Sequence, residues 1–305
     1  MIEILKITNG EIKKLQKPIK DCWINMVSPT HAELKSLEKY VKIPKDIIHS
    51  VKDKDELSSI DEYDEEGFHF VLIRVPVRSN NNLEYSTVPL GIIKSKKYII
   101  TISYFHNDVI DQFKTKQIHT GKQREFGLKL LLTSTESYLN YLREVNKKIY
   151  TIRKDLQKSM KNKNLMKLLD IEKSLVYFNT SLKANKNLIV RMKKEKLFKK
   201  SHKDLVEDVI EEYDQALEMN KIYTGILTGM MDGFSSVISN NMNATMKFLT
   251  SITLILMLPT LISSIYGMNL ELPFQHDPNA FLLIIIGSML LSILAIVFFW
   301  KTDLL

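Results

Sequence analysis

Polar and methionine side chains recur along one face of an apolar segment near the end of the chain. Counting back from Gly267 in alternating steps of three and four gives Ser264, Thr260, Met257, Thr253, Thr250, Met246, Asn243, Ser239, Ser236 and Asp232. Hydroxyl, amide and carboxylate oxygens accept hydrogen bonds from water. A lone helix in lipid has no use for such a stripe, whereas a ring of helices places it along a shared aqueous path. The alternative is that these hydroxyls only mediate helix packing.

Two uncharged segments supply the helices that would carry this face. Neither residues 248–266 nor residues 280–300 contain a charged side chain. Each has about 20 residues, enough for an α-helix to cross a hydrocarbon layer of roughly 30 Å. Residues 267–279 are too few to form a domain, so we expect a tight membrane hairpin. Pro259 removes one hydrogen bond inside the first span, which predicts a kink.

Charges beside the hairpin predict its orientation. Lys247 precedes the first span and Lys301 follows the second, whereas the loop between them contains Glu271 and Asp277 but no lysine or arginine. Because basic residues concentrate on the cytoplasmic side, we expect both termini in the cytoplasm and the loop 267–279 outside. The sequence therefore predicts a multi-pass protein of the plasma membrane, without a signal peptide.

Composition argues against several function classes. The formal net charge is +8, and much of the excess lies in residues 183–203. This favours a solvated cytoplasmic surface, or one beside anionic lipid, so we expect no nucleic acid as partner. The single cysteine, Cys22, predicts a small core residue rather than a disulfide. The sequence shows no residue pattern typical of a catalytic site and no GxxxxGK[ST] phosphate loop. We therefore expect neither an enzyme nor an ATP-driven pump.

The sequence before the hairpin has two parts with different patterns of secondary structure. Residues 1–120 alternate strand and helix signals and predict a cytoplasmic α/β domain, with Thr30 and Glu33 forming a capping box. Residues 121–247 predict a helical stalk, which leads into the hairpin 248–305 without an obvious stop. The expected fold is therefore α+β in its soluble part and all-α in the membrane. Expected strands are 2–7, 22–27, 68–75, 88–93 and 98–103, and expected long helices are 124–160, 164–200 and 204–266.

The residues Tyr266-Gly267-Met268-Asn269 stand at the outer end of the first span, with a second span at the extreme C-terminus. In this position the signature resembles that of the CorA magnesium transporters, and the resemblance covers essentially the whole chain. It implies a homopentamer whose first spans line one pore. Asn269 would select hydrated Mg²⁺, Gly267 and Met268 would shape the turn, and Glu271 would be the acidic residue of the outer loop. The family's pore-lining positions correspond here to Asp232, Asn243, Met246, Met257 and Thr260.

The same resemblance implies a cytoplasmic Mg²⁺ sensor between subunits. Asp208 corresponds to one half of this sensor. The family usually carries an acidic pair for the other half after its second short helix, where this chain has His49-Ser50. The acids are displaced to Asp53, Asp55 and Glu56, which we assign to a regulatory metal site.

Mg²⁺ holds its water shell tightly, so amide and hydroxyl oxygens suit an ion that keeps its waters. Met246 and Met257 are poor ligands for a hard ion and are interpreted as dewetting constrictions. A membrane potential of 100 mV supplies about 4.6 kcal/mol for a divalent ion, which is enough to drive uptake. The expected function is channel-like import of Mg²⁺, with Co²⁺ and Ni²⁺ as further candidate ions. The alternatives are a zinc or other transition-metal transporter, or a non-conducting membrane-anchored sensor.

Overall fold

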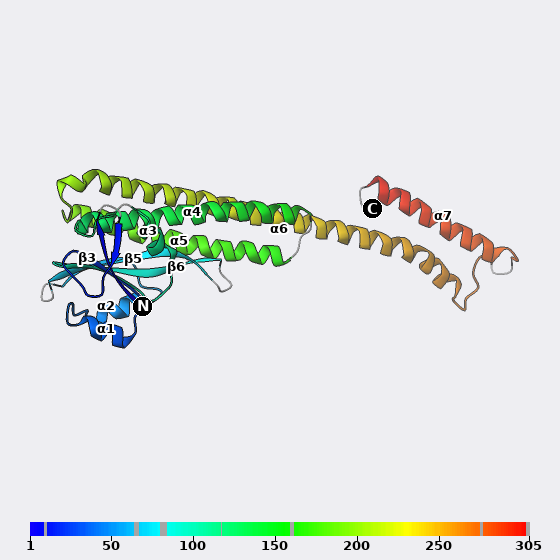
Figure 1. Ribbon diagram of the computed structural model, residues 1–305. Coiled ribbons are helices and arrows are strands. Elements are labelled where there is room, and N and C mark those ends of the chain that lie inside the picture. The colour runs from blue at the N-terminus through cyan, green and yellow to red at the C-terminus, as the bar shows by residue number, and fades with distance from the viewer. Residues whose placement is uncertain are drawn as a thin grey trace. The chain divides into compact units, whose positions relative to one another are not determined.

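Strand and helix signals alternate in the first part of the chain and become purely helical later, and the folded chain follows this change (Figure 1). The computed structural model describes residues 1–8, 11–63, 67–79, 84–116, 118–158, 162–274 and 277–302. Two compact units result, residues 1–228 and residues 229–305. The elements are β1 (Ile2–Thr8), β2 (Glu11–Lys14), β3 (Cys22–Val27), α1 (His31–Leu37), α2 (Lys45–Lys52), β4 (Ser59–Tyr63), β5 (Phe68–Arg78), β6 (Tyr85–Ser95), β7 (Tyr98–Ser103), α3 (Asp108–Lys114), α4 (Gln123–Lys158), α5 (Asn162–Lys194), a 3₁₀ turn (Lys200–His202), α6 (Lys203–Tyr266) and α7 (Ala280–Lys301).

The strands of the first unit form a 7-stranded sheet in the order β2-β1-β3-β7-β6-β5-β4. β3 and β7 pair in parallel, and the other neighbours are antiparallel. The strand β2 at one edge is exposed throughout, and β4 at the other edge is partly exposed. Charged side chains on such edges discourage pairing with a second sheet.

Alternation along β3 divides the sheet into two buried faces. Cys22 and Ile24 belong to a core with α1 and α2, which confirms Cys22 as a core residue. Trp23 points to the other face, where its ring meets Phe113 of α3 and Phe126 of α4. Figure 1 shows α1 and α2 on one side of the sheet and α3 to α5 on the other, so this unit has three layers. Its core buries apolar side chains on both faces.

The predicted capping box is present at the start of α1. The Thr30 hydroxyl accepts a hydrogen bond from the backbone N–H of Glu33 at 3.3 Å, and the Glu33 carboxylate accepts one from the backbone N–H of Thr30 at 2.8 Å. Together they satisfy two backbone donors that the first helical turn leaves open.

The long helices follow the predicted pattern, with one difference at the end of α5. This helix ends at Lys194, several residues before the predicted end at 200. Lys196 adopts a left-handed conformation with φ 56°, and the backbone N–H of Leu197 bonds the carbonyl of Met192 at 3.1 Å. This arrangement closes a helix because it satisfies its last carbonyls.

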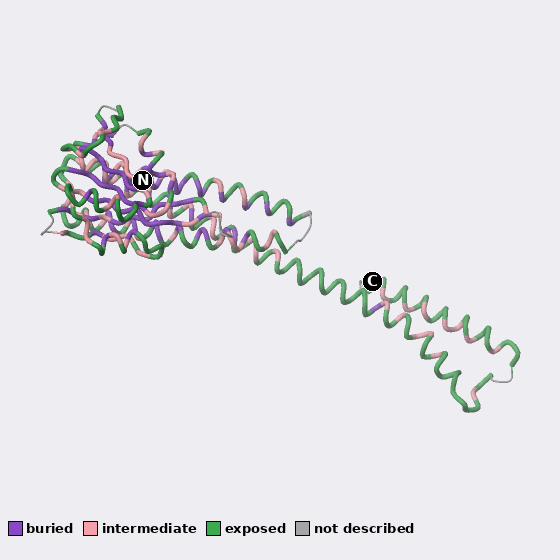
Figure 2. The backbone as a smooth tube through the Cα atoms, turned by 60° about the horizontal axis from the view of Figure 1, so that its bottom comes forward, coloured by how far each residue is buried: buried purple, intermediate pink, exposed green. Residues whose placement is uncertain are grey.

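Among the residues that the structure describes, two helices are long and apolar enough to cross a membrane: the segment Lys200–Tyr266 that contains α6, and α7. Figure 2 shows buried backbone concentrated in the sheet and the helices packed on it, whereas α7 and the last part of α6 are mostly exposed. The domain boundaries expected at residues 120 and 247 stay predictions. The helices α4 and α5 pack on the sheet, so the sheet and these helices belong to one compact unit.

Candidate ion pathway and regulatory acids

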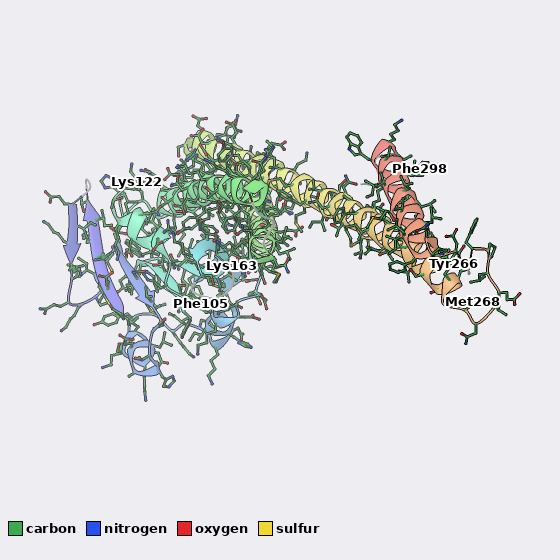
Figure 3. The ribbon with its side chains drawn as sticks, turned by 90° about the vertical axis from the view of Figure 1, so that its right-hand side faces the viewer. Phe105, Lys122, Lys163, Tyr266, Met268 and Phe298 are labelled. Atoms are coloured by element: carbon green, nitrogen blue, oxygen red, sulfur yellow. The ribbon has the colours of Figure 1, made fainter. Side chains whose placement is uncertain are left out.

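The signature residues form the turn that ends α6. The backbone N–H of Gly267 still bonds the carbonyl of Ser263 at 2.9 Å, and that of Met268 bonds the carbonyl of Ile265 at 3.2 Å. A Cβ on Gly267 would lie 3.3 Å from the Ser263 oxygen, so a larger residue would push against the last turn. Figure 3 shows Tyr266 and Met268 at this turn and Phe298 at the far end of α7. Glycine thus permits the chain to leave the helix sharply.

The loop after this turn presents polar groups to its surroundings. Asn269 and Glu271 are both exposed, so their side chains are free to meet an ion at the mouth of an assembly. The Asp277 carboxylate accepts a hydrogen bond from the backbone N–H of Asn279 at 2.8 Å and so orders the approach to α7. Residues 275 and 276 of the predicted outer loop lie outside the described residues.

The predicted stripe is exposed along the whole first span. Thr250, Thr253, Thr260 and Ser264 are exposed, and Met257 is 58% exposed. The Thr253 hydroxyl donates to the carbonyl of Leu249 at 2.8 Å, and the Thr260 hydroxyl donates to the carbonyl of Leu256 at 2.9 Å. Each hydroxyl hydrogen is therefore used within the helix, and each oxygen keeps acceptor capacity for water.

The opposite face of the same span is the less exposed one. Ser251 is only 3% exposed, and Ile255, Leu258 and Ile262 are half-buried. At 100° per residue these positions lie across the helix from the stripe. The figures show α7 running back beside this part of α6, and α7 is the other helix described in this unit (Figures 1 and 2). From Thr253 to Ser264 the stripe therefore lies on the side of α6 opposite this less exposed face.

The amino-terminal part of the stripe borders a hollow. Asn243, Met246 and Thr250 line a space of about 760 Å³ together with Phe299 of α7. Met246 is 57% exposed, and Asn243 and Asp232 are exposed as well. The polar positions here are close to α7 without being covered by it, so water has access to them.

The acids predicted to sense Mg²⁺ lie on two elements. Asp53, Asp55 and Glu56 follow α2, and the Asp53 carboxylate accepts a hydrogen bond from the backbone N–H of Asp55 at 3.0 Å. Asp208 is exposed on α6, as are Asp53 and Asp55. Within one chain, no three His, Cys, Asp or Glu side chains among the described residues are placed to hold a metal. A site between subunits would take its ligands from two chains, so this assignment stays a prediction.

Sequence reasoning did not find the arginine that holds the acidic loop. Arg74 is 4% exposed in β5, and its guanidinium donates to the carbonyl of Glu56 at 2.6 Å and to the carbonyl of Thr87 at 2.9 Å. It also donates to the Ser181 hydroxyl of α5 at 3.1 Å, and Asn185 of α5 bonds both backbone groups of Arg74. Burial lowers the pKa of Arg74, although Asp55 and Asp53 oppose this shift. The sequence signal that could have revealed this residue was an arginine inside an otherwise apolar strand.

Comparison with known proteins settles what kind of chain this is. Residues 20–301 match the family described as CorA-like Mg²⁺ transporter protein. The chain belongs to this family. Members of the CorA family are ion transporters or channels, so the chain is a membrane transport protein and not an enzyme. The resemblance carried by the Tyr266–Asn269 signature is thereby confirmed at the level of the family.

Individual CorA relatives match over most of their length. The cobalt/magnesium transport protein CorA of Methanocaldococcus jannaschii is 30% identical over 292 residues, covering 92% of this chain and 89% of that protein. The magnesium transport protein CorA of Helicobacter pylori is 23% identical, with the same two coverages. The complete CorA structure from M. jannaschii superposes with a TM-score of 0.84 at 24% identity, covering 99% of this chain and 98% of the other. This confirms the expected CorA fold: a soluble α/β domain, a long helix and two C-terminal candidate spans.

Proposed function

We propose that this protein is a homopentameric channel through which hydrated Mg²⁺, and also Co²⁺, enters the cytoplasm. The observation that carries the proposal is the exposed stripe on α6, opposite the face beside α7. In a lone hairpin these hydroxyls would meet lipid, whereas around an axis they line water. The number five rests on the resemblance to the CorA transporters, and Co²⁺ on the name of the M. jannaschii relative.

Oxygen-bearing side chains suit an ion that keeps its water. Mg²⁺ gives up its hydration shell reluctantly. Asn269 would accept hydrogen bonds from the waters of the ion at the outer mouth, with Glu271 attracting cations to it. Thr250, Thr253, Thr260, Ser264 and Asn243 would continue the path inward. Asp232 would meet the ion at the cytoplasmic mouth, and Met246 and Met257 would form constrictions that close by dewetting.

Direction follows from charge. Lys247 and Lys301 flank the spans, whereas the loop 267–279 contains Glu271 and Asp277 but no lysine or arginine. This distribution of charge supports a multi-pass plasma-membrane protein with both termini in the cytoplasm. A potential of 100 mV, negative inside, favours entry of a divalent ion by about 4.6 kcal/mol. The path must therefore be able to close.

Closure would depend on cytoplasmic Mg²⁺ held between subunits. Asp208 of one chain and the Asp53–Glu56 loop of the next would repel each other without a cation, and bound Mg²⁺ would remove this repulsion. The exposure of Asp53, Asp55 and Asp208, together with the hydrogen bond from Arg74 to Glu56, supports such a contact.

Flux into liposomes tests the proposal. The purified chain is reconstituted with a Mg²⁺-sensitive dye inside, and a K⁺ gradient with valinomycin sets the potential. Wild type should admit Mg²⁺ when the interior is negative, and Asn269→Ala should lose most of this flux. Asn146→Ala changes an exposed amide on α4 and serves as the matched control. Zn²⁺ flux without Mg²⁺ flux would replace the proposal with zinc transport, and absence of all flux would leave a non-conducting sensor.

A further inference from the structure

Two adjoining hollows in the first unit are not used by the ion pathway. The first, here called the basic hollow, measures about 450 Å³ and has a mostly cationic lining. Its basic residues are Lys94, Lys96, Lys122, Arg124, Lys199 and His202. Asp21 is the one acid among its described lining residues. The second, here called the apolar hollow, measures about 150 Å³ and shares Lys94, Gln123 and Arg124 with the first.

Three distant segments of the chain supply the basic residues of the basic hollow. Lys94 lies near the end of β6, Lys96 lies in the turn that follows, and Arg124 comes from the first turn of α4. The third segment follows α5, where the left-handed Lys196 turns the chain back. As a result Leu197 and Phe198 line the apolar hollow, and Lys199 lines the basic one.

Most of the basic charge in the hollow has no acidic partner. Lys122 is paired with Glu125 at 3.3 Å. Among the described residues, no carboxylate lies within salt-bridge distance of Lys94, Arg124 or Lys199. Burial lowers the pKa of Lys94, and the charge of Arg124 lowers it further. Lys94 and Arg124 are half-buried neighbouring cations without a salt bridge. Such an arrangement is unfavourable, and a bound anion would relieve it.

Gly127 keeps the apolar hollow open. It lies within α4, where glycine weakens a helix relative to alanine. Packing does not require a glycine there, because a Cβ on Gly127 would find no atom within 4 Å. The residue nevertheless lines the apolar hollow, so the missing side chain leaves space beside the shared Lys94 and Arg124. Space retained at a cost in helix stability suggests that something occupies it.

We propose that the joined hollows bind a nucleoside polyphosphate, with its phosphates in the basic hollow and its base in the apolar one. Several cations around one space match more than one phosphate group. The amino-terminal end of α4 adds backbone N–H groups beside Arg124, and its dipole favours negative charge. Phe198 provides a flat apolar surface for a base. A fatty acid fits less well, because one carboxylate would leave most of the cations unmatched and the apolar hollow is too small for a long chain.

Binding to the full chain in detergent micelles tests this proposal without any flux measurement. Calorimetric titrations use ATP, inorganic triphosphate and adenosine, each with EDTA present so that Mg²⁺ does not compete. ATP should bind at least about tenfold more tightly than triphosphate, and adenosine should bind too weakly to detect. Lys94→Glu with Arg124→Glu should weaken ATP binding at least about tenfold, the loss expected when charge-assisted hydrogen bonds disappear. Lys173→Glu makes the same charge change at an exposed site on α5 and should have no effect.

Gly127→Leu separates the two halves of the site. The added side chain enters open space, so folding should persist, which near-native melting of the variant will establish. ATP binding should then weaken at least about tenfold, while triphosphate binding stays unchanged. Three results would each overturn the proposal: no ATP binding to wild type, equal affinity for ATP and triphosphate, or full ATP affinity in a folded Gly127→Leu protein.

Discussion

At Arg74 a full positive charge is buried without a carboxylate in direct contact. Its guanidinium makes five hydrogen bonds to carbonyl and hydroxyl oxygens of Glu56, Thr87 and Ser181 in one fork-shaped arrangement. Lysine has three donors on one nitrogen and cannot reproduce this fork. Arg74→Lys should therefore lower the free energy of unfolding by about 2–4 kcal/mol, since buried acceptors lose their donors. Urea unfolding followed by Trp23 fluorescence measures this, with exposed Arg153→Lys as control. A stability equal to wild type would contradict this role for the fork.

The carboxylate of Glu3 has two basic partners. Its carboxylate accepts hydrogen bonds from Lys114 at 2.7 Å and from Lys14 at 3.1 Å. The bond from Lys114 is the largest cause that lowers the pKa of Glu3 from its ordinary value of 4.5. A lowered carboxylate pKa stabilises the folded state above the unfolded-state pKa, and this contribution is lost as pH falls through the folded-state pKa. Glu3→Gln should thus be less stable than wild type at pH 7. The gap should shrink below about pH 4.5, and an unchanged gap would exclude this linkage.

On the scale of one element, Gly127 limits the stability of α4. Because a Cβ there meets no atom within 4 Å, Gly127→Ala should raise the free energy of unfolding by about 0.5–1 kcal/mol. The change should appear as a higher melting temperature of the reconstituted chain, with Mg²⁺ flux unaltered. A lower melting temperature would mean that the open space is needed for packing.

Elements with strong local patterns could be predicted from the sequence, and those without could not. The apolar strand β3, the capping box at Thr30 and the leucine spacing of α4 each lie within one short segment. β2 and β4 were missed because these two edge strands carry charged residues and lack a clear apolar alternation. The short helix α3 was missed as well, although Asn107 caps its first turn.

The same distinction applies to the candidate sites. The stripe from Asp232 to Ser264 is visible in the sequence because it repeats along one helix. Lys94, Arg124 and Lys199 meet only after the sheet and helices have packed, so no local pattern announces them. The proposed contact between Asp208 and the Asp53–Glu56 loop would require a second chain, so the sequence of one chain does not define its geometry.

At the scale of the whole molecule, the two faces of the first span need different surroundings. One face carries Thr253 and Met257 and is exposed, whereas the other carries Ser251 and Ile255 and lies on the less exposed side toward α7. A hydrocarbon environment suits aliphatic residues but offers hydroxyl oxygens no donor. An assembly that surrounds an aqueous axis satisfies both faces at once. This requirement of the helix does not depend on the number of chains in the assembly.

Accessibility of single cysteines distinguishes the two faces in the assembled protein. The native Cys22 is fully buried and burial raises the pKa of its thiol, so wild type should not react with a charged, membrane-impermeant thiol reagent. Met257→Cys lies on the stripe, and its modification should block Mg²⁺ flux because the reagent occupies the water path. Ile255→Cys lies across the helix two residues away and should neither react nor lose flux. Reaction at Ile255→Cys with none at Met257→Cys would mean that the stripe does not face water. The proposal of a conducting assembly would then lose its basis.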